Sequence, residues 1–185
     1  MKPSEILRRY GAVFGLIALA LAFAFATGAP ARFLSVHNLR VVLAQTLTVG
    51  VACLGMTLVV IAGGIDLSVG SSIALCGVST AIALRAGTPP TLALLAGVAT
   101  GGLVGLVNGL AITRLGVIPF IATLGMLGAA RGIAKWLADE QTVNVPATFI
   151  DELAVTVPRH AAWLVAPGIW LGGALAVIMA LVLQR

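Results

Sequence analysis

Apolar residues follow one another along this chain in long stretches that are separated by short polar or glycine- and proline-containing breaks. A helix needs about 20 residues, at a rise of 1.5 Å per residue, to cross the hydrocarbon core of a membrane. The pattern predicts about six membrane-spanning helices, over Gly11–Thr27, Val41–Ala62, Leu67–Leu84, Thr91–Ile112, Val117–Ile133 and Trp163–Leu183. The second, fourth and sixth stretches are comfortably long enough, whereas the other three are short and favour tilted, paired or broken helices.

Basic residues at the start of the chain determine the predicted orientation. Lys2, Arg8 and Arg9 precede the first apolar stretch and favour a cytoplasmic N-terminus, and the other basic residues divide evenly between the two sides. The same N-terminal pattern, followed by small residues, also describes a secretory signal peptide. The apolar stretch of about 17 residues is longer than a usual signal core, and it therefore favours a retained helix.

The composition agrees with a membrane protein. Of the 185 residues, 60% are hydrophobic and 9% are charged, and the mean hydropathy is +1.12. About a quarter of the residues of a soluble domain are charged, so the chain is predicted to be an integral protein of the lipid bilayer. The net charge of +5 comes from basic residues that flank apolar stretches and form no patch, so no nucleic-acid partner is predicted.

The sequence offers no constellation for catalysis. No serine, histidine or carboxylate cluster has the spacing of a catalytic or metal site, and Cys53 and Cys76 both lie in apolar stretches. Gly101, Gly102 and Gly105 follow no predicted strand and precede no lysine, unlike a phosphate-binding loop. We therefore predict no catalytic residue, no metal and no cofactor, and a membrane-embedded enzyme is the least supported class.

The segment GGIDLSVG places a carboxylate between two uncharged apolar stretches. Such a carboxylate is costly, and it is therefore paired, caps a helix or takes part in function. As a cap, it would accept hydrogen bonds from the first amides of the next helix, at the positive helix end. As a functional group, it would lie at a broken helix beside a solute pathway. Both interpretations stay open, and both predict a helix break at Gly63, Gly64, Asp66, Ser68 and Gly70.

The length of the preceding stretch limits the depth of this carboxylate in the membrane. A helix over Val41–Ala62 covers about 33 Å. Asp66 is therefore expected near one membrane face unless the backbone breaks early or doubles back.

Four glycines of the fourth stretch recur at a spacing of four residues: Gly97, Gly101, Gly105 and Gly109. A glycine-lined face lets another helix approach closely, so these residues are predicted to be helix-packing contacts. Asn108 neighbours this face, where it would either hydrogen-bond to a neighbouring helix or take a direct part in transport.

Three blocks of sequence, in order, resemble the ribose-type sugar permeases of ATP-binding cassette importers. The first is GMTLVVIAGGIDLSVGS over residues 55–71, and the second is Asn108-Gly109. The third is PFIATLGM over residues 119–126, followed by Arg131-Gly132. The resemblance extends from about Ser35 to the C-terminus, and its GIDLSVG block is specific.

The resemblance implies a permease subunit that carries a monosaccharide, often a pentose, across the bacterial cytoplasmic membrane and is not itself an enzyme. Such a subunit pairs with a second permease copy, sits on two cytoplasmic ATP-binding subunits and receives solute from an extracytoplasmic sugar-binding protein. Family members continue through further helices and a cytoplasmic segment that docks the ATPase. Residues 1–185 are therefore expected to form a single permease domain that is incomplete at its C-terminus.

Two hypotheses follow for the polar residues. In an importer of neutral sugars, Ser71, Asn108 and Thr123, together with Ser68, are candidate residues of the translocation path, and Asp66 fixes the broken helix. The alternative is an ion-coupled secondary transporter in which Asp66 is the proton or cation site. The two differ in whether transport follows ATP or an ion gradient.

Overall fold

The computed structural model describes residues 3–154 and 167–184, and within these ranges it contains helices and their connections but no strand. The helices are α1 (Pro3–Ala26), α2 (Pro30–Phe33), α3 (Val36–Ile61), α4 (Val69–Arg85), α5 (Pro90–Thr113), α6 (Pro119–Leu137), α7 (Phe149–Ala154) and α8 (Pro167–Leu183). The predicted all-α class is thereby confirmed for the described residues.

The longer helices coincide with the predicted apolar stretches. By length and composition, α3 and α5 are able to cross a membrane, while Tyr10–Ala26, α4 and α8 are shorter apolar helices. The start of the sixth predicted stretch, residues 163–166, lies outside the described residues. The count of six crossings stays a prediction.

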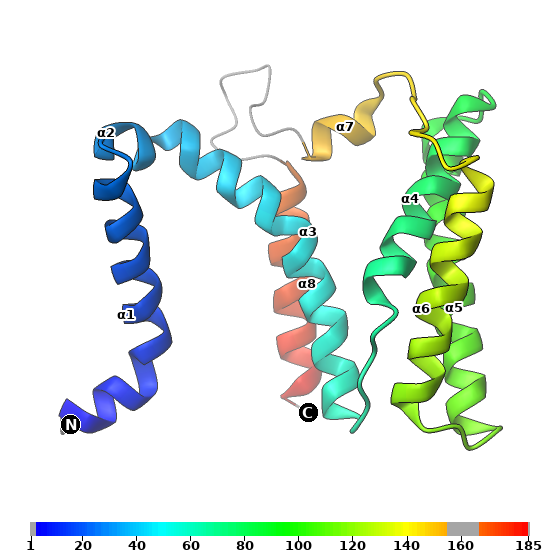
Figure 1. The fold of residues 1–185 in the computed structure, drawn as a ribbon, viewed down its shortest axis with the longest axis horizontal. Coiled ribbons are helices and arrows are strands. Elements are labelled where there is room, and N and C mark those ends of the chain that lie inside the picture. The colour runs from blue at the N-terminus through cyan, green and yellow to red at the C-terminus, as the bar shows by residue number, and fades with distance from the viewer. Residues whose placement is uncertain (1–2, 155–166, 185) are drawn as a thin grey trace.

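The helices form two packed groups. α4, α5 and α6 contact one another in a three-helix bundle, and α3 packs along α8. Figure 1 shows the bundle at one end of the molecule, α3 and α8 in the middle and α1 at the other end. Leu75, Val104, Ala130 and Ala134, one or more from each helix of the bundle, form its apolar core.

Local sequence explains where several helices begin. α5 and α6 each have a proline in the first turn, where the missing N–H costs nothing and the fixed φ suits a helix. α3 begins after Ser35, whose hydroxyl accepts a hydrogen bond from the N–H of Asn38 at 3.2 Å.

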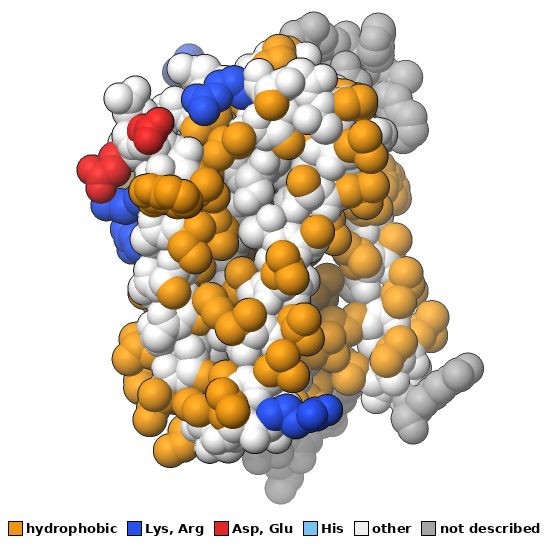
Figure 2. Space-filling view, turned by 90° about the vertical axis from the view of Figure 1, so that its right-hand side faces the viewer, with side chains coloured by type: hydrophobic (Ala, Val, Ile, Leu, Met, Phe, Trp, Pro, Cys, Tyr) orange, Lys and Arg blue, Asp and Glu red, His pale blue; other side chains and the backbone are white. Residues whose placement is uncertain are grey.

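The exterior of the protein is apolar and much of its interior is built from small residues. Ala93 and Ala130 are 0% exposed, whereas Leu115 and Trp136 are 77% and 75% exposed. Figure 2 shows apolar side chains over the bundle face, with charged side chains towards its two ends and none across the middle. An uncharged apolar band between two charged ends is the pattern of a surface that faces lipid.

Close approach of α4 and α5 depends on a missing side chain at Gly97. A Cβ atom there would meet Thr80 Oγ1 and would lie 3.2 Å from the carbonyl oxygen of Cys76. Rotation of the Thr80 side chain away from this atom would break a hydrogen bond, because its hydroxyl donates to that same carbonyl at 2.9 Å.

We therefore predict that Gly97→Ala lowers the thermal stability of the protein in detergent, since overpacking a close contact costs about 1–3 kcal/mol. The matched control is Gly102→Ala on the same helix, where a Cβ atom would meet nothing within 4 Å. This control is expected to keep or raise stability, because alanine is favoured over glycine in a helix by roughly 0.5–1 kcal/mol. Melting followed by gel filtration checks both, and equal melting temperatures would contradict the packing role.

Candidate functional site

α3 ends in a turn that requires glycine. Gly63 has a φ of +79°, in the left-handed region, and its N–H donates to the carbonyl of Val60 at 3.0 Å. The N–H of Gly64 donates to the carbonyl of Val59 at 2.9 Å. This pair of bonds is a Schellman motif, which satisfies the last carbonyls of a helix and turns the chain away from the helix axis.

The chain then doubles back before α4 begins. Residues 62–68 lie outside helices, and Figure 1 shows this connection rising so that α4 begins part-way along α5 and α6 rather than at their ends. The first turn of α4 therefore lies within the length of the bundle, between α3 and α6. The depth of Asp66 in the membrane, which the sequence left open, stays a prediction.

Asp66 and Ser68 together begin α4. Asp66 Oδ1 accepts the backbone N–H of Ser68 at 2.7 Å and the hydroxyl of Ser68 at 2.6 Å. The first of these bonds closes a turn just before the helix, since α4 begins at Val69 and Ser68 is the residue that precedes it, so it is not the bond to the first helical amides that the capping interpretation expects. Two donors and the positive end of α4 stabilise the negative charge of the carboxylate.

Asn108 reaches the same hydroxyl from α5. Its Nδ2 lies 3.1 Å from Ser68 Oγ, across 40 residues of sequence. The Ser68 hydroxyl has one hydrogen, which goes to Asp66, so its oxygen accepts from the Asn108 amide group. Ser68 is 0% and Asn108 is 7% exposed, so this bond joins α5 to the start of α4 where water does not compete.

Thr123 ties the doubled-back segment to α6. Its hydroxyl lies 3.1 Å from the carbonyl oxygen of Ile65 and 2.9 Å from that of Pro119, one turn earlier in α6. A single hydroxyl hydrogen is thus shared between its own helix and the segment. Asn108 and Thr123 together hold the segment between α5 and α6.

The buried polar side chains of the described residues converge on this place: Ser68, Ser71, Asn108 and Thr123. Each has a hydrogen-bond partner, since Ser71 Oγ donates to the carbonyl of Ser68 at 2.8 Å. The structure therefore brings together the polar residues that the sequence singled out for a translocation path.

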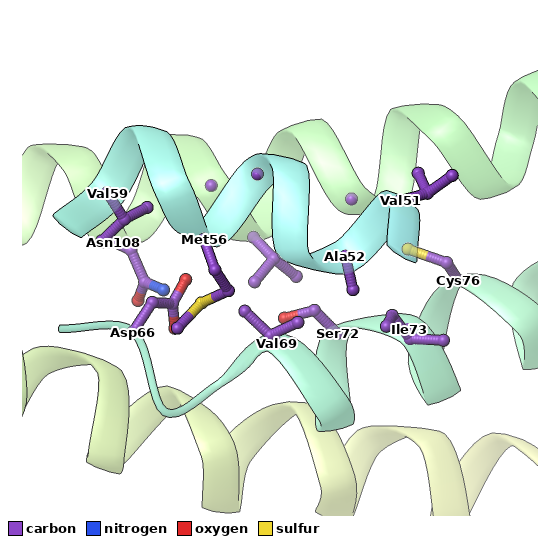
Figure 3. A pocket seen from close by; sticks show the side chains of 14 residues that line it. Val51, Ala52, Met56, Val59, Asp66, Val69, Ser72, Ile73, Cys76 and Asn108 are labelled. Atoms are coloured by element: carbon purple, nitrogen blue, oxygen red, sulfur yellow. The ribbon is translucent and has the colours of Figure 1, made fainter. Parts of the chain in front are cut away.

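A cavity of about 410 Å³ opens beside the network, between α3, α4 and α5. Figure 3 shows Asp66, Asn108 and Met56 pointing towards one another at one end of it, while Cys76 and Ile73 lie at the other. The walls are mainly apolar. This volume falls within the range of roughly 300–1,000 Å³ that is typical of small-molecule sites.

The glycines of α5 divide into two pairs. A Cβ atom at Gly97 would meet Thr80, and one at Gly101 would lie 3.1 Å from Cys76 Sγ. This pair of glycines therefore faces α4. Gly105 and Gly109 have nothing within 4 Å of such an atom. Gly101 and Gly105 line the cavity, where the absence of side chains leaves space.

Gly70 lies in the first turn of α4 and contributes to a different cavity. A Cβ atom there would meet nothing within 4 Å. Gly70 lines this second space together with Ser71 and Arg131, between α4 and α6. Its role differs from that of Gly63 and Gly64, which end the preceding helix.

The wall contributed by α3 was missed by the sequence reasoning. Ala52, Gly55, Met56 and Val59 line the cavity at a spacing of three and four residues. That spacing marks one helix face and was a usable signal. The carbonyl of Ile65, in contrast, is a backbone group that no side-chain pattern identifies.

Residues 38–185 match the family model described as the branched-chain amino acid transport system permease component. The chain belongs to this family. The match confirms the resemblance to transport permeases that the three sequence blocks indicated, and it includes every residue of the polar network.

Known permeases are similar over much of this chain. The D-allose transport system permease protein of Escherichia coli K12 is 35% identical over 136 residues, which are 73% of this chain and 41% of that protein. The galactofuranose transporter permease protein of the same strain is 41% identical over 103 residues, 56% of this chain and 30% of that protein. The autoinducer 2 import system permease protein of Yersinia pestis Pestoides F is 34% identical over 155 residues, 80% of this chain and 46% of that protein.

This permease chain therefore spans less than half the length of these relatives. No solved structure matches it significantly.

We predict that Ser68→Ala and Asn108→Ala each destabilise the permease, because each leaves a buried polar group without its partner, at a cost of about 1–3 kcal/mol. The two losses overlap, so the double variant should lose clearly less stability than the two single losses together. Thermal unfolding in detergent measures all three. Thr113→Ala, which removes an exposed bond within α5, is the control and is expected to change little. Additive losses would show that Ser68 and Asn108 do not interact.

Proposed function

We propose that this chain is part of the membrane-spanning permease of an ATP-binding cassette importer, and that its cargo is a monosaccharide, a pentose or similar sugar. Two relatives are named as permeases for D-allose and galactofuranose, which supports a sugar as cargo. The ordered sequence blocks support the importer class. The principal structural support is the network of buried polar side chains at the start of α4, of which Asn108 lines the apolar-walled cavity together with Asp66.

Polar groups inside a lipid bilayer are costly because no water is there to bind them. A polar side chain inside a membrane is expensive and is kept where it has a partner or a function. In this bundle the buried polar side chains of the described residues are not scattered but gather at the start of α4. A neutral solute rich in hydroxyl groups needs such partners at mid-membrane, where water is absent.

The segment of residues 62–68 acts, in this proposal, as a helix break within the membrane. Transporters bind their solutes at the midplane with discontinuous helices, whose free ends and unwound backbone face the pathway. The doubled-back connection and the part-way start of α4 suit that arrangement. The proposal includes about six crossings and a cytoplasmic N-terminus.

The proposed partners belong to the whole transporter. They are a second permease copy, cytoplasmic ATP-binding subunits and an extracytoplasmic sugar-binding protein, in a bacterial cytoplasmic membrane. ATP hydrolysis is assigned to the partner subunits, and this chain provides the conduit. The match of this chain to permeases that are named as parts of transport or import systems supports such an assembly.

A second candidate is an ion-coupled transporter. The observation in its favour is that Asp66 lies at the cavity with one of its two carboxylate oxygens engaged by Ser68. Such a carboxylate could bind a proton or a cation. Energy coupling separates the two candidates.

We predict that deletion of the gene that encodes this chain abolishes uptake of at least one labelled sugar among D-ribose, D-xylose, D-allose and D-galactose. Uptake should stop when arsenate depletes ATP and should survive an ionophore while ATP is maintained. Restoration by the intact gene is the control. Unchanged uptake of all four sugars after deletion would contradict the proposal, and uptake that collapses with the ion gradient at constant ATP would favour the second candidate.

A further inference from the structure

Two oxygen atoms of the polar network accept no hydrogen bond among the described residues, and both belong to residues that line the cavity. Asp66 uses Oδ1 for both bonds from Ser68, so Oδ2 receives none of the hydrogen bonds found among the described residues. Asn108 uses its amide nitrogen, and its carbonyl oxygen receives none of them. The assignment of nitrogen and oxygen is fixed chemically, because Ser68 has already given its only hydrogen to Asp66 and can only accept.

We propose that Asp66 Oδ2 and the carbonyl oxygen of Asn108 bind hydroxyl groups of a neutral, polyhydroxylated solute in this cavity. The inference rests on the proposed function and deepens it, because it names the atoms that touch the cargo. Asp66 then has two roles, with one oxygen beginning α4 and the other facing the solute. Asn108 likewise holds Ser68 with its nitrogen and the solute with its oxygen.

The geometry suits hydroxyl groups on neighbouring carbon atoms. The side chains of Asp66 and Asn108 both contact Ser68 Oγ, at 2.6 and 3.1 Å, so they lie close enough to be bridged by a single oxygen. The two free oxygens belong to these neighbouring side chains, which suits them to take hydrogens from two hydroxyl groups on adjacent carbon atoms. Asn108 is 7% exposed, so its oxygen is held in a fixed direction by packing.

Other classes of ligand fit less well. An anion would be repelled by the Asp66 carboxylate. A bare metal cation needs about six oxygen ligands, whereas most of the cavity wall is apolar. The charge of Asp66 is already stabilised by two donors from Ser68 and by the start of α4, so it does not demand a cation.

The apolar wall near the two acceptors gives the cavity a lining that suits a sugar. Met56 and Val59 of α3 and Val69 of α4 line the cavity near its polar end. Sugars present C–H groups on one ring face and hydroxyl groups at the edge, so an apolar wall with a few polar groups matches them. A flexible methionine adapts to solutes that differ in shape.

The test compares uptake by the complete transporter with the wild-type chain and with Asp66→Asn. Asparagine keeps an oxygen that can accept from Ser68 but replaces the free acceptor at the cavity by an NH₂ donor. The probe is whichever of D-ribose, D-xylose, D-allose and D-galactose the wild type takes up with the lowest KM. With the sugar-binding protein saturated by the probe, the rate of uptake by the variant is expected to fall about tenfold or more, as for loss of a hydrogen bond to a charged group.

The matched control is Thr100→Val in α5, which removes a hydroxyl that bonds to Ala96 within its own helix, away from the cavity. Its rate of uptake under the same condition is expected to stay within about twofold of the wild-type rate. Membrane levels and melting temperatures identify any variant that fails to fold. If the wild type takes up a sugar and folded Asp66→Asn does so at an unchanged rate with the sugar-binding protein saturated, the inference is wrong while the proposed function stands.

A second measurement separates the cavity from the sugar-binding protein. Monodeoxy analogues that the isolated sugar-binding protein binds as tightly as the probe sugar are tested as labelled substrates of wild-type uptake, and they should include two neighbouring positions at which loss of the hydroxyl lowers the rate about tenfold or more. If every such analogue is taken up as fast as the parent sugar, no hydroxyl is bound in the cavity and the inference is overturned. Absence of uptake of all four sugars by the wild type would instead contradict the proposed function itself.

Discussion

The hydroxyl group of Ser68 is the point on which the arrangement of this permease chain depends. It donates to Asp66 at 2.6 Å and accepts from Asn108 at 3.1 Å, while its side chain is 0% exposed. The hydrogen bonds of a buried hydroxyl that both donates and accepts stabilise the fold more than the same bonds in water. A buried polar group that is left without a partner is costly. The contact joins the start of α4 to α5, and Thr123 joins the preceding residues to α6. The doubled-back chain is held between two helices by these few bonds.

Packing around this point follows from side-chain size. Hydrophobic attraction does not drive helices together in lipid, so close contact depends on small residues and interhelical hydrogen bonds. Gly97 and Gly101 bring α5 close to α4, with Thr80 and Cys76 against them. Further along the same face, Gly105 meets no neighbour and lines the cavity instead. One glycine series therefore gives contact at one end and space at the other.

Much of the fold could be predicted from the sequence, because long apolar stretches and their breaks determine membrane helices strongly. The helix end at Gly63 and Gly64 and the hydrogen bond from Ser68 to Asp66 follow local rules that need only a few residues. The return of the chain along the bundle could not be predicted, since it depends on contacts made 40 and 58 residues away, at Asn108 and Thr123. The cavity escaped prediction for a related reason, since its lining residues come from α3, α4 and α5 and are brought together only by the tertiary fold.

The most direct measurement is a cryo-electron microscopy structure of the complete transporter in a lipid nanodisc, at a resolution that shows side chains. We expect residues 62–68 to lie extended within the bilayer, with the Ser68 side chain between Asp66 and Asn108. If these residues lie at the membrane surface, or if Asp66 and Asn108 are separated with Ser68 contacting neither, the central role of the Ser68 hydroxyl is contradicted.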